Sequence, residues 1–461
     1  MFEEILFEKA GYLLSILLSG GGEYAEIFYE KQKVIRLEYR NSKLDSSSVG
    51  IEEGVSLRLI KNGTTFFGFI SEPNYESLKE LARGLSMSFG QGAVALGLKR
   101  LKGKASSEIK LSDISLRERA EKLKLASEYA KEGGIKLEEV FAALTDKSRK
   151  ILVINSLGEI ASDEQERVAF RIQVISKDKE GNLRSAYETA GHTGGFELLK
   201  DDVLKNISLS AVRRVSNLIN AKPAPLGSME VVLSASAGGT MIHEAVGHGF
   251  EADLVQKGMS IYAGKIGQKV ASELISVVDD GTLEGKNGSY NIDDEGVPSQ
   301  RTVLIDRGVL VGYMYDRLSA IKESRSSTGN GRRQSYMHVP MVRMSNTYIL
   351  PGETPPGDIF AGIKRGLFVK KMGGGEVNTV TGDFVFEVTE GYLIQSGEIS
   401  YPVRNALLIG NGPKALMDVE AVGNDLGWAI GMCGKDGQGV PVGDAQPSLR
   451  IRSMVVGGSD A

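Results

Sequence analysis

Two of the four histidines in this 461-residue chain lie five positions apart, with a glutamate directly after the first. His243, Glu244 and His248 form an H-E-x-x-x-H pattern, which is one residue longer than the H-E-x-x-H motif of zinc peptidases. In the shorter motif both histidines lie on one face of a helix and bind the same ion. The pattern therefore indicates a metal site with a carboxylate beside it.

The spacing of the two histidines places a demand on the helix that carries them. Residues five apart on a regular α-helix diverge by about 140°, because each residue turns the helix by about 100°. Both imidazoles can reach one ion only if the helix is bulged, overwound or ended between them. Gly247 and Gly249 favour this, since glycine tolerates irregular backbone. We therefore predict an irregular helix across residues 245–247.

A hydrolytic zinc site uses three protein ligands and leaves a fourth position for water. Glu244 has the right type and place to act as a general base, taking a proton from that water and passing it to the leaving amine. The motif supplies two ligands and leaves the third open. The candidates elsewhere in the chain are Cys433, His338, Glu251 and Asp253.

The candidates differ in how well they suit a metal. Cys433 lies in a glycine-rich segment that can approach another element closely, and a thiolate is a strong zinc ligand. The alternative for Cys433 is a buried thiol in a turn. His338 follows Arg332 and Arg333, whose charges disfavour a divalent cation.

The composition excludes several classes of protein. Hydrophobic residues make up 41% and charged residues 25% of the chain, and 55 basic residues against 59 acidic ones leave a net charge of -4. This balance argues against a nucleic-acid partner. No stretch approaches the roughly 18 apolar residues of a membrane span, and the segment Met1–Ala10 is acidic where a signal peptide is basic. With a single cysteine and no intrachain disulfide, we expect a cytoplasmic protein without a membrane partner.

The elements that must position the motif fall into two domains of an α+β chain. Within residues 1–220, helical periodicity and strand-like alternation produce the order helix, antiparallel strands, helix twice, which indicates a possible internal duplication. Residues 221–227 contain two prolines and a glycine and are predicted to be a linker. In residues 228–461 strand signals dominate, so we predict a mostly β domain that carries the H-E-x-x-x-H helix.

Several segments of the second domain resemble the TldD/PmbA family of zinc peptidases. The motif segment is followed in family order by an R-M-x-N-T-Y segment, a glycine-rich strand end and an M-C-G-K-x-G-Q segment; in this chain they are residues 243–253, 343–348, 369–377 and 432–438. The resemblance covers the second domain by motif and the first domain only by layout. Because H-E-x-x-x-H is intact, the chain resembles the TldD type and not the PmbA type, also called TldE, which lacks it.

The resemblance implies a site and an activity. It implies zinc held by His243, His248 and Cys433, with Glu244 as the base that activates water for hydrolysis of unfolded peptides or small proteins. It also implies a heterodimer with a PmbA/TldE-type paralogue, or else a homodimer. The alternative function is a non-catalytic peptide-binding or gyrase-modulating protein with a structural metal.

We also predict how the substrate is held. An extended peptide is expected to pair through backbone hydrogen bonds with a strand edge near Gly374 and Gly375, or near Met344–Tyr348. The arginines Arg332, Arg333 and Arg343 are candidates to hold a substrate carboxylate or to stabilise the oxyanion, with ordinary structural pairing as the alternative.

Two acidic residues close behind the motif have a supporting role in this prediction. Glu251 and Asp253 follow His248 within five positions. Metal-binding histidines usually donate their second ring N–H to a carboxylate. We therefore expect Glu251 and Asp253 to orient a motif histidine and not to bind the metal.

Overall fold

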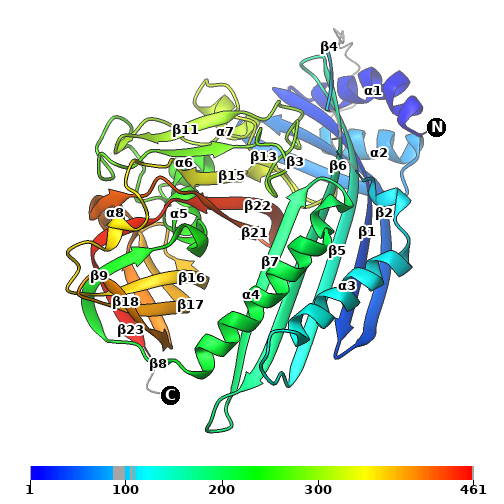
Figure 1. Ribbon diagram of the computed structural model, residues 1–461. Helices are drawn as coiled ribbons and strands as arrows, with labels where there is room; N and C mark the ends of the chain where they lie inside the picture. The colour runs from blue at the N-terminus through cyan, green and yellow to red at the C-terminus, as the bar shows by residue number, and fades with distance from the viewer. Residues whose placement is uncertain (1, 87–98, 104–106, 108, 459–461) are drawn as a thin grey trace.

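The computed structural model describes residues 2–86, 99–103, 107 and 109–458. The chain forms an N-terminal part and a C-terminal part that lie side by side, with helices and strands in both (Figure 1). The predicted α+β class is confirmed. Among the residues described, no helix is both long enough and apolar enough to cross a membrane.

The N-terminal part is built on a seven-stranded sheet. Its order is β3-β2-β1-β5-β6, with β4 and β7 both paired to β6. The strands are β1 (Tyr24–Arg40), β2 (Lys43–Lys61), β3 (Thr64–Ser71), β4 (Lys99–Lys102), β5 (Glu139–Asn155), β6 (Glu159–Lys177) and β7 (Leu183–Thr193). Strands β1 to β3 and β5 to β7 are two antiparallel meanders, joined by antiparallel pairing of β1 with β5.

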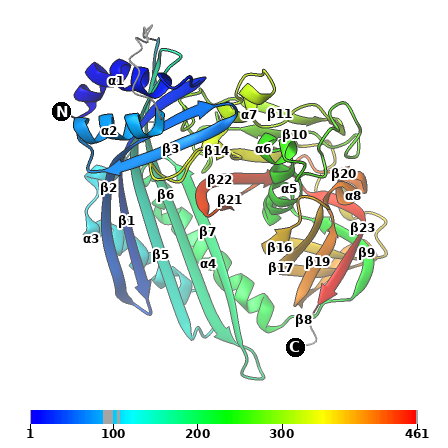
Figure 2. The same cartoon turned by 180° about the vertical axis from the view of Figure 1, so that it is seen from behind.

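In the chain, one helix precedes and one helix follows each of the two meanders. In space, these four helices cover one face of the sheet (Figures 1 and 2). They are α1 (Phe2–Leu18), α2 (Tyr75–Ser86), α3 (Leu116–Lys131) and α4 (Asp201–Ile219). Ile27 lies in the core under α1 and α2, and Leu37 lies in the core under α3 and α4. Because strand side chains alternate, residues 27 and 37 of β1 share a face. The predicted order of helix, strands, helix therefore occurs twice, on one continuous sheet.

The C-terminal part contains a barrel of five strands. The pairing order β16-β9-β23-β19-β17 returns to β16, which closes the ring. The strands of this sheet are β8 (Lys222–Pro223), β9 (Gly227–Leu233), β16 (Arg365–Val377), β17 (Asp383–Gln395), β18 (Glu398–Arg404), β19 (Ala406–Asn411), β20 (Val419–Val422) and β23 (Leu449–Gly458). Leu233, Val369, Phe386 and Leu408 belong to the core of this part. Strand β8 lies in the predicted linker and pairs with β18.

A second sheet of six strands carries the cysteine segment. Its order is β12-β11-β10-β15-β22-β21, so β21 is an edge strand. The strands are β10 (Val277–Asp280), β11 (Arg301–Asp306), β12 (Val309–Leu310), β15 (Asn346–Ile349), β21 (Gly427–Lys435) and β22 (Gln438–Gln446). Around it lie the two-stranded ribbon of β13 (Gly331–Arg332) and β14 (Met341–Val342) and the short helix α7 (Arg317–Lys322). The short helix α8 (Gly412–Met417) packs instead against the barrel strands β19 and β23.

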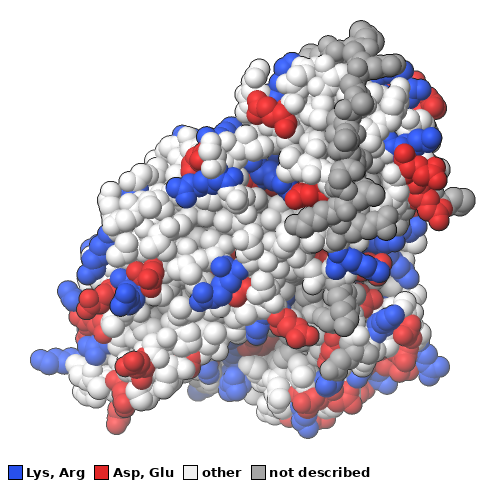
Figure 3. Space-filling view, turned by 90° about the horizontal axis from the view of Figure 1, so that it is seen from above, with Lys and Arg blue, Asp and Glu red and all other residues white. Residues whose placement is uncertain are grey.

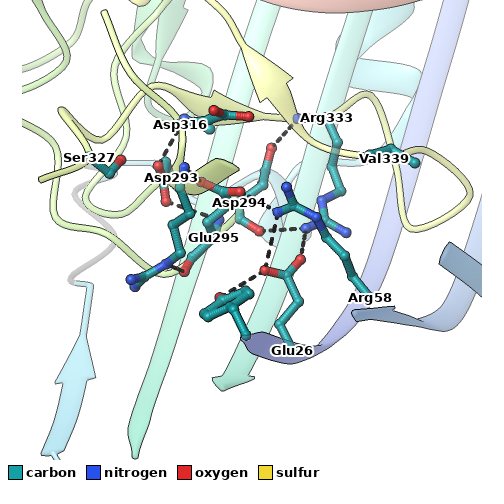
Figure 4. A network of polar contacts seen from close by, with 12 residues as sticks. Glu26, Arg58, Asp293, Asp294, Glu295, Asp316, Ser327, Arg333 and Val339 are labelled. Atoms are coloured by element: carbon teal, nitrogen blue, oxygen red, sulfur yellow. Dashed lines mark hydrogen bonds and ion pairs between the residues drawn. The ribbon is translucent and has the colours of Figure 1, made fainter. Parts of the chain in front are cut away.

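Buried charged side chains join the two parts (Figure 4). The face of the N-terminal sheet opposite the helices carries Glu26 and Arg58, both with fully buried side chains. Arg333 of the C-terminal part donates to Glu26, and Arg58 donates to Glu295. A charge buried this deeply is tolerated only when it is paired, so these contacts constrain how the two parts fit together.

The outer surface has a different charge pattern. On the face shown in Figure 3, basic and acidic side chains are interspersed and neither sign forms a continuous patch. The pattern on this face agrees with the small net charge of -4, and the described residues that are visible there form no continuous basic stripe of the kind that binds nucleic acid.

Candidate metal centre

The H-E-x-x-x-H segment forms a helix whose geometry changes twice. It begins as α5 (Thr240–Ile242), becomes the π-helix η4 (His243–Gly247) and ends as the 3₁₀-helix η5 (His248–Phe250). The backbone N–H of His248 donates to the carbonyl of His243, five residues earlier, where an α-helix would use four. The wider turn brings the two imidazoles together, with ring centroids 5.1 Å apart. The irregular helix predicted from the spacing is present.

The glycines of the motif serve a purpose other than the one predicted. Gly247 has a φ of −55°, which is ordinary helical backbone open to any residue. A Cβ at this position would lie 2.0 Å from Sδ of Met344, and a Cβ at Gly249 would lie 2.7 Å from the ring of Tyr262. Glycine is thus required because buried side chains pack against the backbone, and not because the backbone is strained.

The structure brings Cys433 to the two histidines. One ligand atom from each of His243, His248 and Cys433 lies within 4.8 Å of the others. The Sγ atom of Cys433 is 3.4 Å from Nε2 of His248, although the two residues are 185 positions apart in the chain. All three side chains are nearly or fully buried. Their donor set, two imidazoles and one thiol, suits zinc and related divalent metals.

Two carboxylates determine which nitrogen of each imidazole faces the cluster. Nδ1 of His243 is 2.7 Å from Asp444, and Nδ1 of His248 is 2.9 Å from Glu251. A carboxylate beside Nδ1 holds the proton there and leaves Nε2 available as a ligand atom. The arrangement is that of a metal-binding histidine pair, so the residues present fit the metal that the motif implies.

The charges of the cluster shift its pKa values strongly. Burial opposes ionisation of Cys433, but the neighbouring imidazoles His243 and His248 outweigh it and lower the thiol pKa to about 5. Burial also opposes protonation of His248, but Glu251 and Cys433 raise its pKa to about 10. Without a metal the thiolate therefore lies between positively charged rings, and a cation would displace their protons.

Glu244 lies beside this cluster with a half-buried side chain. Burial raises the pKa of its carboxyl group, although the nearby His243 and His248 act in the opposite direction. Within the part of the chain that the structure describes, its carboxylate has no hydrogen-bond partner. A carboxylate with a raised pKa and free oxygens is suited to accept a proton and release it again.

The two acids predicted to orient the histidines have different contacts. Glu251 contacts His248 as expected. Asp253 instead lies 2.8 Å from Nζ of Lys435, and the same lysine is 3.0 Å from Glu251. Asp253 thus reaches the histidine only through Lys435 and Glu251.

Asp444 and Lys435 belong to the site but were not among the predicted residues. A local signal for Asp444 does exist. Asp436-Gly437 is a two-residue hairpin turn, which fixes the register of β21 against β22. In that register Cys433 pairs with Val440, so Asp444, four residues beyond Val440, lies on the same face as the cysteine.

The three arginines predicted to contact substrate all donate to protein groups. Arg343 donates to the carbonyls of Cys433 and Gln438 and is fully buried. Arg333 donates to Glu26, and Arg332 donates to the carbonyls of Met344 and Pro441. Their substrate roles stay predictions, and of the three only Arg343 contacts the backbone of a cluster residue.

One of the two predicted strand edges is absent. The stretch Met344–Tyr348 enters β15, which pairs with β10 on one side and β22 on the other, so the prediction of a free edge there is wrong. Strand β16 pairs with β9 only through Val369. Among the residues described, its continuation with Gly374 and Gly375 is paired on one side only, with β17.

His338 does not join the cluster. Its Nδ1 is 2.9 Å from the hydroxyl of Ser335, and the group of possible ligands in the described residues consists of His243, His248 and Cys433 alone. The preference for Cys433 over His338 as a third ligand agrees with this placement.

Comparison with known proteins gives matches along nearly the whole chain. Three family models match in order: PmbA/TldA metallopeptidase domain 1 over residues 25–89, the central domain over 109–219 and the C-terminal domain over 226–458. A metalloprotease TldD homolog of Haemophilus influenzae is 35% identical over 450 residues, which cover 95% of this chain and 93% of the relative. A metalloprotease of Methanothermobacter thermautotrophicus is 34% identical, covering 97% and 99% of the two chains.

A further relative carries the metal in its name. The zinc metalloprotease TldD homolog of Saccharolobus solfataricus is 32% identical over 259 residues, 56% of this chain and 57% of the relative. The histidine and cysteine cluster and these names together imply a metal.

Two solved structures share the fold. A protein of Thermotoga maritima, named as a candidate modulator of a DNA gyrase, superposes with a TM-score of 0.80 at 22% identity over 99% of this chain and 100% of that chain. TldE from Thermococcus kodakarensis superposes with a TM-score of 0.75 at 18% identity over 99% and 100%.

Proposed function

Because this chain belongs to the PmbA/TldD metallopeptidase family, we propose that it is a zinc-dependent peptidase that cleaves unfolded peptides or small proteins, with Glu244 as its general base. The observation that carries the proposal is the meeting of His243, His248 and Cys433 beside Glu244. An open three-ligand cluster with an adjacent free carboxylate is typical of a hydrolytic site and not of a closed structural one.

The proposed mechanism assigns a task to each residue of the site. His243, His248 and Cys433 would hold the metal, which when bound supplies the Lewis acidity that makes water nucleophilic and stabilises negative charge on the peptide carbonyl. Glu244 takes the proton of the attacking water and passes it to the amine as the peptide bond breaks. Asp444 and Glu251 keep the imidazoles in one tautomer and orientation.

A peptide can reach this site along a free strand edge. The turn η3 (Ala235–Ala237) leads into the motif helix and lies between β16 and β21: the hydroxyl of Ser236 donates to the carbonyl of Lys370, and Gly238 packs on Ala429. Both strands have an unpaired edge among the described residues. Backbone pairing along such an edge holds an extended chain with little sequence preference and excludes folded proteins, which fits an unfolded substrate.

The proposal includes a partner and a compartment. A TldE-type paralogue is the proposed partner, because TldE from Thermococcus kodakarensis shares this fold; a homodimer is the alternative. The cytoplasm is the proposed location, since the single cysteine is a free, buried thiol and the sequence therefore holds no disulfide.

The test is cleavage of an unstructured, fluorescently quenched peptide by the zinc-loaded chain, alone and together with a TldE-type partner. Glu244→Gln is expected to retain zinc and to reduce cleavage by at least about 100-fold, the usual effect of losing a general base. Glu398→Gln, an exposed glutamate of β18, is the matched control and should cleave like the unaltered chain. Removal of the metal with a chelator should abolish cleavage, and zinc should restore it.

Two results would contradict the proposal. Equal cleavage by Glu244→Gln and the unaltered chain would remove Glu244 from its role. Stoichiometric zinc with no cleavage of any peptide, in the presence of the partner, would favour the alternative of a peptide-binding or gyrase-modulating protein with a structural metal.

A further inference from the structure

A cavity of about 810 Å³ lies between the N-terminal sheet and the C-terminal part. Strands β1, β2, β5, β6 and β7 form one wall with the face that the helices leave uncovered. The opposite wall consists of residues 332–335 and the hairpin of β21 and β22. The cavity is large enough for several side chains of an extended peptide.

The walls of this cavity are strongly basic. Seven cationic side chains line it against the two carboxylates Glu52 and Asp294: Arg36, Lys147, Arg149, Arg167, Arg171, Arg332 and Arg333. The excess is notable because the chain as a whole has a net charge of -4. The local balance of charge therefore favours an anionic ligand.

Arg36 and Arg171 are exposed. Of the other five cations, three have no carboxylate partner in the part of the chain that the structure describes. Arg167 donates to the carbonyls of Asn287 and Ser289 and to the side-chain oxygen of Gln165. Arg332 donates only to carbonyls, and Lys147 has no hydrogen-bond or ion-pair partner in the part of the chain that the structure describes. Arg332 is buried, and Lys147 and Arg167 are half-buried. Cations withdrawn from water are normally paired, so this grouping favours the binding of a negative charge.

A fourth cation has spare bonding capacity. Arg149, whose side chain is 8% exposed, contacts Glu30 and Asp294 through Nε and Nη1. Its Nη2 is buried and has no partner. Guanidinium groups bind carboxylates through two parallel N–H donors, and an unused Nη2 leaves such a donor available.

The pKa values agree with this picture. Burial and the repulsion of Arg149 and Arg167 lower the pKa of Lys147 to about 8. Burial and the repulsion of Arg332 and Arg149 likewise lower the pKa of Arg167 to about 9. An anion among these groups would offset the repulsion and return both pKa values toward their ordinary range.

The position of the cavity relative to the metal cluster connects it to catalysis. Ile430, Gly431 and Met432 of β21 line the cavity, and Cys433 is the next residue. Met432 is 70% exposed whereas Cys433 is 3% exposed, because neighbouring side chains of a strand point to opposite faces. An extended peptide along the edge of β21 would likewise present one side chain to the metal cluster and the next to the cavity.

We propose that this cavity binds a carboxylate of the peptide substrate, so that the peptidase prefers an acidic residue, or the C-terminal carboxylate, close to the bond that is cleaved. The proposal rests on the peptidase function proposed above. A carboxylate suits the site because Lys147, Arg149 and Arg167 lie close together on two neighbouring strands of one wall, where Lys147 pairs in register with Arg167, and the cavity that they line adjoins the strand that carries Cys433.

The test uses one unstructured peptide in matched versions. Glu is compared with Gln at successive positions, and a free C-terminal carboxylate is compared with an amide. We expect kcat/KM to be at least about tenfold higher for one carboxylate version, as for a charge-assisted hydrogen bond. A preference that follows Glu identifies the side chain as the source, and one that follows the free end identifies the C-terminus.

Variants show whether the cavity causes the preference. Lys147→Gln should reduce the ratio of the two kcat/KM values by about fivefold or more, whereas Lys43→Gln, an exposed lysine of β2 outside the cavity, should leave the ratio unchanged. An unaltered ratio in Lys147→Gln would overturn the proposal. Because Lys147 has no protein partner, its replacement leaves no group unpaired.

A binding measurement separates this proposal from the peptidase function. Fluorescence anisotropy with the Glu244→Gln chain reports binding of the same peptides without cleavage. If binding depends on the carboxylate but the unaltered chain cleaves none of the peptides, the proposed carboxylate site stands and the proposed peptidase function is overturned. If all versions of the peptide bind and are cleaved equally, the proposal that the cavity binds a carboxylate is overturned and the peptidase function stands. The same proposal is overturned if a single-stranded DNA oligonucleotide binds more tightly and displaces the acidic peptide.

Discussion

At the scale of single residues, the candidate centre depends on charges that support one another. The thiol of Cys433 is acidic because two imidazoles neighbour it, and the imidazole of His248 is basic because Glu251 and Cys433 neighbour it. Asp444 has the same relation to His243, whose pKa is raised well above its ordinary value despite the opposing effect of burial. The metal-free cluster therefore holds protons that a cation must displace.

Metal binding should for this reason depend on pH in a defined direction. Because the pKa values of both imidazoles are raised and that of Cys433 is lowered, binding at pH 7 should release about two protons. Affinity should therefore fall roughly 100-fold as the pH drops from 7 to 6. Below the thiol pKa of about 5, a third proton competes and the dependence becomes steeper. Calorimetry in buffers with different ionisation enthalpies measures the number of protons released.

The variant Asp444→Asn provides the check. Loss of this carboxylate lowers the pKa of His243, so proton release at pH 7 should decrease toward about one, and metal affinity should fall by about 10- to 100-fold because the imidazole loses its orienting partner. The same release from Asp444→Asn and the unaltered chain would show that His243 is already neutral without metal.

At the scale of elements, a single π-turn makes the H-E-x-x-x-H spacing usable. The extra residue in η4 is accommodated by the hydrogen bond from His248 to His243, and the surrounding core holds this geometry in place. Met344 is fully buried against Gly247, and Tyr262 packs on Gly249 and on the ring of Phe250. The segment that supplies Met344 therefore positions the helix although it contributes no ligand.

Gly247→Ala tests this packing. Its Cβ would overlap Sδ of Met344, which lies 2.0 Å away, so we expect a loss of about 1–3 kcal/mol in the free energy of unfolding. The adjoining His248 should shift and metal affinity should decrease. Combining the change with Met344→Ala should restore part of the metal affinity, because the space is reopened.

Gly84→Ala is the matched control for that substitution. Gly84 lies within α2, and a Cβ there meets nothing within 4 Å. Alanine in a helix interior is favoured over glycine by roughly 0.5–1 kcal/mol, so this variant should be slightly stabilised. Unchanged stability and metal content in Gly247→Ala would contradict the packing argument.

At the scale of the whole molecule, the N-terminal sheet serves as a wall of the candidate site. Its helix-covered face is apolar, and the other face presents charged residues to the C-terminal part (Figure 4). Some of these charges pair across the boundary, as Arg333 does with Glu26. Others, such as Arg167, line the basic cavity without a carboxylate partner among the described residues. The same face therefore joins the two parts and shapes the space beside β21.

Arg333→Ala should reveal how much this pairing contributes to stability. The side chains of Arg333 and Glu26 are both fully buried, and removing Arg333 leaves Glu26 with Arg58, 3.6 Å away, as its remaining ion-pair partner. The expected loss is about 1.5–3 kcal/mol in the free energy of unfolding, as for a hydrogen bond between charged groups, seen as a lower transition temperature in calorimetry. A loss below about 1 kcal/mol would mean that Arg58 alone compensates the charge of Glu26.

The exposed pair Arg117 and Glu121 provides a contrast on the surface. The side chain of Arg117 is 88% exposed, and ion pairs of this kind contribute about 0.3–0.5 kcal/mol. Arg117→Ala should therefore change the transition temperature very little, which distinguishes the loss of a buried pair from the general loss of an arginine.

Much of the fold follows from patterns that are local in the chain. Strand alternation, helical periodicity and the proline-rich segment 221–227 predicted the α+β class and the repeated order of helix, strands, helix. The closed barrel was not predictable, since it depends on β9 and β16, which pair across more than a hundred residues. Likewise, the prediction of a free strand edge at Met344–Tyr348 was wrong because β10 and β22, which are far away in the sequence, pair with its two sides.

For the candidate site, the sequence by itself determined the chemistry available: two histidines, a glutamate and one cysteine, with a spacing that required an irregular helix. These properties are carried by residue types and short intervals. Only the tertiary structure decided that Asp444 holds His243 and that Lys435 bridges Glu251 and Asp253. It also decided that Lys147 and Arg167 line a cavity beside β21 without a carboxylate partner among the described residues. The physical reason is that hydrogen bonds and charges act through distances in space, which the packing of two sheets sets and the order of residues alone does not.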